Sequence, residues 1–166
     1  LTDDEKELGV CLMDIGGGTT DIIVYKDGAV RHTAVIPIAG DQITNDISVA
    51  FRTPQQSAED IKINHGSCDS TKASSQELID VPLVDGRAPK KINAKDLSEI
   101  IEPRVNELFE LVMNELTRSK LNNQIASGIV ITGGSGLMKH MVDVAEKNFK
   151  QSVRIGYPMG VDGLKQ

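Results

Sequence analysis

The sequence predicts an α/β fold in which a mixed sheet is flanked by helices and joined to a small α+β subdomain. Three β-forming runs follow one another within the first 38 residues, and another comes at 128–134. Apolar residues at helical spacing occupy much of the interval between them. The chain has 166 residues, 39% of them apolar and 25% charged, so it can bury one core or two small ones.

The first elements are predicted to be three consecutive antiparallel strands. Residues 8–15 and 20–26 are apolar runs separated by a glycine turn. Residues 29–38 follow directly after Asp27-Gly28, and Asp-Gly between two β-forming runs is a strong hairpin signal. The three runs therefore predict one side of the sheet.

Two helices are predicted next. Residues 41–51 carry apolar side chains at helical spacing. A second helix is expected within 53–66, with Thr53 as its N-cap, Pro54 in its first turn and a stop at Gly66. The sheet therefore leads into a helical pair.

The middle of the chain predicts a polar loop, an exposed hairpin and a long helix. The loop covers 67–76, and two strands within 77–92 are joined at Asp85-Gly86. The helix covers 96–121. Asp96 and Glu99 are expected to form a capping box, and Pro103 is expected to kink the helix.

The last part of the chain predicts a buried strand at 128–134, a helix at 137–149 and a short strand within 152–158. We expect two subdomains. The larger comprises 1–52 and 122–166, and the smaller comprises 53–121.

Composition excludes several functions. The net charge is −6, and the chain has no Trp, two Tyr and three Phe, so it offers little for stacking or binding nucleic acid. No run approaches the length of a membrane span. Cys11 is expected to be buried and Cys68 to be exposed, and two such cysteines form neither a disulfide framework nor a metal motif. This favours a reducing, cytoplasmic setting. The charged start at Leu1 suggests a piece of a longer protein.

The glycine turn after the first strand predicts a phosphate-binding hairpin. It is not a P-loop, because no Gly-Lys-Ser/Thr follows, and it is not a Rossmann turn, because a strand follows. Glycines let successive backbone N–H groups approach phosphate oxygens. The predicted phosphate contacts are Gly16, Gly17, Gly18, Thr19 and Thr20. Asp14 is expected to hold Mg²⁺ through water. The alternative is a plain glycine-rich hairpin turn.

A second glycine turn, Gly133-Gly134-Ser135-Gly136, follows the strand at 128–134. Taken alone, it fits equally well a generic connection from a strand to a helix. The three histidines, at positions 32, 65 and 140, lie far apart without the spacing of metal ligands. Apart from Mg²⁺ with a nucleotide, the sequence therefore predicts no metal site.

Three motifs resemble those of the superfamily of actin, DnaK-type chaperones and sugar kinases. "DIGGGTTD" resembles its second phosphate motif, "GIVITGGSGL" its adenosine motif, and "AEDIK" a helix that brackets the ribose and adenine. The resemblance implies an actin-like (ribonuclease H-like) half-domain that binds ATP with Mg²⁺. It places adenine beside Gly133, Gly134 and Ser135, and it gives Glu59 and Lys62 the bracketing roles.

Within that superfamily the chain resembles the FtsA family of bacterial cell division proteins. The resembling segments cover 31–66, 80–92, 98–112 and much of 151–164. The likeness implies subdomains 2A and 2B, the second half of the family's fold. It also implies filament formation, contacts with other division proteins, and a location at the inner face of the cell membrane at the division site. The family's amphipathic membrane-targeting helix lies outside this sequence.

Positive charge gathers around residues 87–104 of this acidic chain, and such contrast steers acidic partners. The alternative is a solvated face. The FtsA resemblance implies docking of the C-terminal tail of FtsZ on subdomain 2B, a segment that orders on binding. We expect Arg104 to contact a tail carboxylate. The other expected contacts are Asn106, Glu107, Lys90, Lys91 and Lys95.

The predicted function is that of a cell division adaptor that binds ATP in a cleft between two half-domains, polymerises and recruits FtsZ. The alternative is an ATPase of the same fold from another system, such as pilus assembly or protein folding. A sugar or acetate kinase comes third, because neither an acceptor site nor a base is found. With half a cleft, we expect weak or no ATP binding by these residues alone. The full-length protein is expected to be at most a weak ATPase.

Overall fold

The computed structural model describes residues 1–158, and its larger part is a mixed five-stranded sheet of order β3-β2-β1-β6-β7. The three N-terminal strands are antiparallel, whereas β6 and β7 continue the sheet in parallel from β1. Their bounds are β1 (Val10–Ile15), β2 (Thr20–Lys26), β3 (Ala29–Ile36), β6 (Ile129–Thr132) and β7 (Val153–Ile155). The predicted mixed sheet is confirmed.

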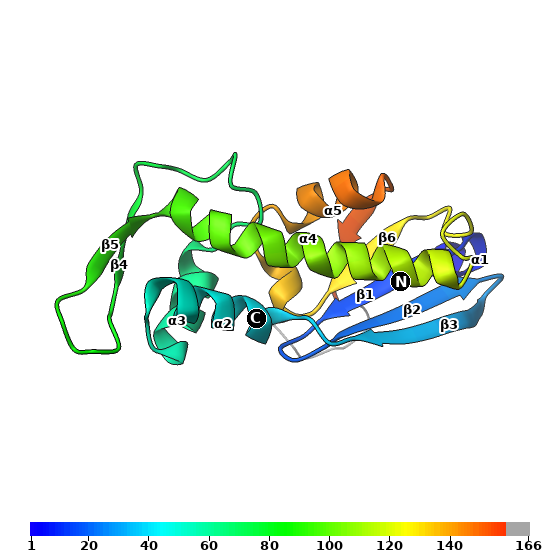
Figure 1. The fold of residues 1–166 in the computed structure, drawn as a ribbon. Coiled ribbons are helices and arrows are strands. Elements are labelled where there is room, and N and C mark those ends of the chain that lie inside the picture. The colour runs from blue at the N-terminus through cyan, green and yellow to red at the C-terminus, as the bar shows by residue number, and fades with distance from the viewer. Residues whose placement is uncertain (159–166) are drawn as a thin grey trace.

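The remaining elements form the helical layer and a separate hairpin. The helices are α1 (Asp3–Leu8), α2 (Gly40–Phe51), α3 (Gln55–His65), α4 (Ala94–Arg118) and α5 (Met141–Phe149), with a 3₁₀ turn, η1 (Gly134–Leu137). The hairpin is the two-stranded sheet of β4 (Leu78–Val81) and β5 (Lys90–Asn93). Figure 1 shows α4 running from this projecting hairpin across the five-stranded sheet. The described part of the chain has no helix long and apolar enough to cross a membrane.

The core lies between the sheet and α4. Met13 and Ile22, which are partners across β1 and β2, are fully buried on the face that α4 covers. The spacing of Phe109, Val112 and other apolar residues gives α4 one buried side. Phe109 packs edge-on against Phe149 of α5, with ring centroids 5.2 Å apart. The helix that we expected to belong only to the smaller subdomain therefore also covers the sheet.

The opposite face of the sheet is covered at one end by α1, which the sequence analysis did not predict. Thr2 caps this short helix, and Glu5 accepts two hydrogen bonds from Arg154 of β7, each 2.8 Å long. The guanidinium of Arg154 holds the pKa of Glu5 at about 2, well below its ordinary value, although partial burial acts in the opposite direction. The ion pair therefore fixes α1 to the sheet.

Two predicted helix caps are wrong. The N-cap of α3 is Pro54 rather than Thr53, whose buried hydroxyl has no hydrogen-bond partner among the described residues. The N-cap of α4 is Asn93, whose side chain accepts from the N–H of Asp96 at 2.8 Å. Despite Pro103, α4 is continuous from Ala94 to Arg118.

Two further expectations are also wrong. The helix predicted at 137–149 is divided into η1 and α5, because Met138 is extended and His140 has a φ of +63°. Cys68 is fully buried, with its sulfur 4.0 Å from that of Met141. Burial raises the pKa of its thiol to about 12, and nearby Glu102 and Asp69 add to this effect. Cys11 is buried as predicted.

Candidate nucleotide-binding site

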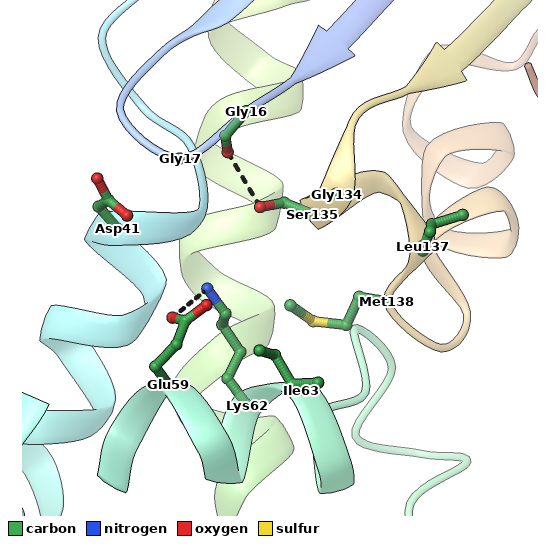
Figure 2. Close-up of a pocket in the computed structure, with 10 residues that line it drawn as sticks. All are labelled: Gly16, Gly17, Asp41, Glu59, Lys62, Ile63, Gly134, Ser135, Leu137 and Met138. Carbon is green, nitrogen blue, oxygen red and sulfur yellow. Dashed lines mark hydrogen bonds and ion pairs between the residues drawn. The ribbon is translucent and has the colours of Figure 1, made fainter. Parts of the chain in front are cut away.

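The two glycine turns lie at the same edge of the sheet. β1 and β6 are parallel neighbours, so the turns that follow them emerge side by side. Together with the first turn of α2 and one side of α3 they enclose a cavity of about 460 Å³ (Figure 2). The lining residues are Gly16, Gly17, Asp41, Glu59, Lys62, Ile63, Gly134, Ser135, Leu137 and Met138. Six of the predicted cofactor residues are therefore brought together.

Hydrogen bonds hold the first glycine turn firmly against its neighbours. The carbonyl of Gly16 accepts from the N–H of Gly40 and from the hydroxyl of Ser135, both at 3.0 Å. The carbonyl of Gly17 accepts from the N–H of Asp41 at 2.8 Å. The turn is thus tied to α2 on one side and to the second glycine turn on the other.

The same turn leaves backbone donors available. The N–H of Gly16 donates to the carbonyl of Thr19 at 3.1 Å. Within residues 1–158, the N–H groups of Gly17, Gly18 and Thr19 donate to no other group. Successive free N–H groups in a fixed glycine turn are suited to phosphate oxygens.

Glycine is required at one position around the cavity, and a second glycine leaves little room for a side chain. Gly133 has a φ of +89°, and a Cβ there would clash with the backbone of Ile15. At Gly40, the first residue of α2, a Cβ would clash with the hydroxyl of Ser135. Close approach of the two turns and α2 therefore depends on these glycines.

Glu59 and Lys62 form a polar side of the cavity on α3. The ammonium of Lys62 lies 2.8 Å from Oε2 of Glu59 (Figure 2), and the hydroxyl of Thr44 donates to the same carboxylate oxygen. Burial alone would raise the pKa of Glu59, but the hydrogen bonds from Lys62 and Thr44 outweigh it and hold that pKa below its ordinary value. Glu59 is therefore an ionised acceptor at neutral pH.

The part of the cavity formed by Ile63, next to Lys62 on α3, and by Leu137 and Met138 is apolar. Ile63 and Leu137 are more than 60% exposed although both are large aliphatic residues, and Met138 lies between their elements (Figure 2). An apolar wall beside a few fixed polar groups is typical of a small-molecule site. Its chemistry suits the flat face of a base.

Thr20 is not where the phosphate prediction requires it. Its side chain is fully buried, and its hydroxyl donates to the carbonyl of Ile38 at 2.7 Å. It holds the segment that follows β3 instead of facing the cavity. Gly18 and Thr19 are exposed beside the lining residues, and Gly133 starts the turn that contributes Gly134 and Ser135.

Asp14 lies at the end of β1, exposed and directly opposite Asp21 of β2. Two carboxylates that face each other across a strand pair repel unless a cation or water separates them. Asp14 also touches the second glycine turn, since a Cβ at Gly133 would lie 2.5 Å from its Oδ1. This position fits a carboxylate that holds a hydrated Mg²⁺. Within the described residues, no three His, Cys, Asp or Glu side chains gather as a metal site.

Asp41 is a lining residue that the sequence analysis did not identify. It is in the first turn of α2, and its carboxylate lies near Gly17. The sequence could have pointed to Asp41 through its position directly after Gly40, where α2 begins shortly after β3 ends.

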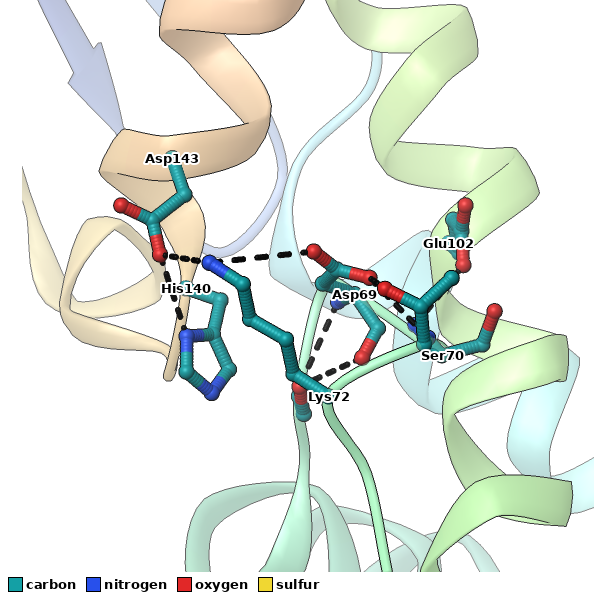
Figure 3. A network of polar contacts seen from close by, with 8 residues as sticks. Asp69, Ser70, Lys72, Glu102, His140 and Asp143 are labelled. Carbon is teal, nitrogen blue, oxygen red and sulfur yellow. Dashed lines mark hydrogen bonds and ion pairs between the residues drawn. The ribbon is translucent and has the colours of Figure 1, made fainter.

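The loop that follows α3 connects the two sides of the cavity. Ser67 pairs with Lys139 in an isolated β-bridge, and the N–H of Cys68 donates to the carbonyl of Lys139 at 2.9 Å. Figure 3 shows Lys72 of this loop between Asp143 and Asp69, with its ammonium 2.7 Å from the carboxylate of Asp143. The polar side on α3 and the apolar side near Leu137 are therefore joined directly.

Arg104 is paired within the chain. Its Nε and Nη2 donate to the two carboxylate oxygens of Asp46 on α2, at 2.7 and 2.9 Å, and its Nη1 donates to Glu107 at 2.9 Å. The hydrogen bonds to Asp46 raise its pKa further. The guanidinium joins α4 to α2, and a partner carboxylate would have to replace one of these acceptors.

The other predicted peptide contacts are spread along α4 and the hairpin. Asn106 accepts a hydrogen bond from Asn148, and Lys91 pairs with Asp80 across β4 and β5. Lys90 and Lys95 are exposed. A helix rises about 1.5 Å per residue, so Lys95 lies roughly 13 Å along α4 from Arg104. The nine intervening steps also turn Lys95 and Arg104 to opposite sides of the helix, so the predicted cations do not gather in one pocket.

Solved structures define the class of protein. The crystal structure of MreB 5 of Spiroplasma citri bound to AMPPNP matches with a TM-score of 0.78 and 24% identity, covering 92% of this chain and 49% of that one. The PilM–PilN type IV pilus biogenesis complex matches with a TM-score of 0.70 and 14% identity, covering 93% of this chain and 37% of that chain. The chain has the fold of an actin-like half-domain, as predicted.

Sequence comparison then gives the family. The family model described as "Cell division protein FtsA" matches residues 11–166. The FtsA of Pseudomonas aeruginosa is 54% identical over 164 residues, covering 99% of this chain, and that of Escherichia coli K12 is 46% identical over 171 residues, also covering 99%. The chain belongs to the FtsA family. It spans about two fifths of the length of these relatives. The predicted family is confirmed, and the alternatives from pilus assembly, protein folding and sugar or acetate phosphorylation are set aside.

Proposed function

We propose that these residues form one half of an ATP-binding cleft in a cell division protein that acts as an adaptor. The observation that carries this proposal is the cavity between the two glycine turns. It combines free backbone N–H groups at Gly17 to Thr19, an ionised acceptor at Glu59 and an apolar wall at Ile63 and Leu137. These suit phosphates, ribose hydroxyls and a base, in that order along the cavity. The AMPPNP bound to MreB 5, a protein of the same fold, agrees with this proposal.

In this proposal the chain's own residues bind and orient the nucleotide. The N–H groups of Gly17, Gly18 and Thr19 hold phosphate oxygens, and Asp14 holds Mg²⁺ through water. The bound magnesium would neutralise phosphate charge. We assign no side chain of the cavity as a general base, and we propose that any hydrolysis also needs the rest of the protein.

The adaptor role rests on α4 and the hairpin. We propose that the protein polymerises at the division site, peripheral to the inner face of the membrane. We further propose that it recruits FtsZ by binding its C-terminal tail on α4 and the hairpin, with Arg104 as the contact to a tail carboxylate. The Asp46–Arg104 pair then acts as an internal competitor, since the tail carboxylate takes the place of Asp46.

Photolabelling tests the nucleotide site. In a full-length FtsA carrying these residues, 8-azido-ATP should label peptides that contain Ile63 or Leu137, and excess ATP should prevent it. The matched control is Asp60→Asn, an exposed change on the outer side of the same helix, which should leave labelling intact. Labelling confined to peptides elsewhere in the protein would refute this placement of the base.

A further inference from the structure

The outer edge of the five-stranded sheet is formed by β3, which covers Ala29–Ile36 and has β2 as its one neighbour (Figure 1). Among residues 1–158, no backbone group outside β2 bonds to this strand. Alternate residues of an edge strand direct their N–H and C=O groups away from the sheet. This edge therefore presents donors and acceptors that a further strand would satisfy.

The usual protections of an edge strand are charged side chains, bulges and prolines, and in β3 they lie toward the two ends. The ladder with β2 skips Arg31, and Pro37 follows the strand. The last ionisable side chain is His32, whose Nε2 lies 2.6 Å from the carboxylate of Glu115, so its ring is held against α4. The stretch Thr33–Ile36 has no charge, bulge or proline, which leaves it open to pairing.

This unprotected stretch is apolar where it is exposed. Val35 is 62% exposed, and Thr33, two residues earlier on the same face, is exposed as well. Both border a cavity on this face of the sheet together with Leu12 and Ile23. An exposed apolar edge with free backbone groups is a template for the addition of a strand.

The regular part of β3 can pair with itself. It runs from His32 to Ile36, and its centre is Ala34. In an antiparallel pair of two copies with Ala34 on the two-fold axis, the whole stretch is paired and Thr33 lies opposite the partner's Val35. No charged side chain then faces one of like sign.

Opposite charges approach each other at both ends of such a pair. Arg31 comes opposite the partner's Pro37. Asp21, which faces Val35 in the ladder of β2 and β3, is exposed and has no ion pair within residues 1–158. The spacings of a sheet put the Cα atoms of Asp21 and the partner's Arg31 roughly 12 Å apart, which the two side chains can span. The present ion pair of Arg31 is with Asp27 and is exposed, so it contributes little.

We propose that β3 pairs with the β3 strand of a second copy of this chain, which joins the two five-stranded sheets into one continuous sheet. A two-fold contact closes at two copies and does not by itself extend a filament. This dimer contact therefore goes beyond the proposed polymerisation, and it does not depend on binding of ATP or of the FtsZ tail.

Disulfide crosslinking tests the contact and its register in a full-length FtsA carrying these residues. Thr33→Cys and Val35→Cys change exposed side chains, whereas the native Cys11 and Cys68 are buried. After mild oxidation a mixture of the two variants should give a crosslinked dimer, which peptide mapping assigns to positions 33 and 35. Neither variant alone should give it, because its two thiols are offset by two residues across the axis. Val49→Cys, exposed on α2, is the matched control. No product from the mixture, or as much product with the control, would overturn the proposal.

Analytical ultracentrifugation of the same protein tests what holds the two copies together. Val35→Lys places a charge on the edge and should weaken dimerisation at least about tenfold. Arg31→Asp and Asp21→Arg should each weaken it about threefold, and the two changes together should restore it, because the opposite charges are exchanged. A dimerisation constant that Val35→Lys leaves unchanged would overturn the proposal.

Hydrogen exchange distinguishes a second copy from other occupants of the edge. The amides of Thr33–Ile36 should exchange rapidly in the monomer and become protected as the dimer forms. Protection already present in the monomer would show that another segment of the protein covers β3, and it would overturn the proposal. Sedimentation of filaments is measured separately. Filaments without the crosslink would also overturn the inference, whereas the crosslink without filaments would refute the proposed polymerisation instead.

Discussion

At some residues the local sequence determines the conformation or burial of the side chain, and at others contacts with distant residues determine it. Gly133 must be glycine because of its positive φ, and the sequence pattern identified that turn directly. Thr53 follows a local capping rule, yet its buried hydroxyl has no partner within residues 1–158, and α3 begins one residue later. Cys68 lies in a polar stretch, but α5 covers it. The burial of Thr53 and Cys68 depends on contacts with distant residues, which a local sequence pattern does not reveal.

The burial of Cys68 predicts low reactivity. Burial and two nearby carboxylates raise its thiol pKa to about 12, and burial alone does the same for Cys11. At pH 8 both thiols are then almost entirely protonated as well as inaccessible. We expect neither to react with a disulfide reagent within minutes in the native chain, and both to react at once in denaturant. Rapid modification of Cys68 in the native chain, located by peptide mapping, would contradict its buried position.

At the scale of elements, the strands and the long helix were predicted because their apolar periodicity is local. The positions of the elements relative to one another were not, and they decide the candidate site. Arg104 was expected to face a partner, but α2 brings Asp46 against it. Lys62 lines the cavity as expected of a ligand contact, and its ammonium also donates to the carbonyl of Gly40 at the start of α2. Both contacts come from α2. The sequence around Arg104 and Lys62 gives no sign of them.

The ion pair between α1 and the sheet predicts a pH-dependent stability. Because Arg154 lowers the pKa of Glu5 from 4.5 to about 2, the stabilisation is fully present above pH 4.5 and is lost as the pH falls toward 2. Allowing for solvent screening, Glu5→Gln should lower the free energy of unfolding by about 1–2 kcal/mol at pH 7. Denaturant unfolding should show this difference shrinking below pH 4. Asp4→Asn on the same helix is the control. An equal effect of both changes at every pH would contradict the role of the pair.

The Asp46–Arg104 pair predicts the response of peptide binding to mutation. Asp46→Asn removes the charge that competes for Arg104, so the affinity for a labelled FtsZ tail should rise about threefold. Arg104→Glu should abolish binding. Fluorescence anisotropy measures both, with Asp60→Asn as a control on α3. If Asp46→Asn weakens binding and Arg104→Glu leaves it unchanged, Arg104 serves only to join α2 to α4.

At the scale of the whole molecule, the cavity is open on the side away from α2, α3 and η1. The free N–H groups, Glu59 and the apolar wall line only part of the surface that a nucleotide presents. The relatives are more than twice as long as this chain. A ligand held by these residues alone would leave its other face in water, which weakens every electrostatic contact it makes. We therefore expect the remaining part of the FtsA fold to complete the site.

Calorimetric titration with Mg-ATP tests this central claim most directly, on this 166-residue chain and on a full-length FtsA that carries it. The half cavity should bind at least about 100-fold more weakly than the full-length protein, because it lacks several hydrogen bonds to charged oxygens. We predict micromolar binding by the full-length protein and weak or undetectable binding by the chain. Micromolar binding by the chain alone, or none by the full-length protein, would contradict the account.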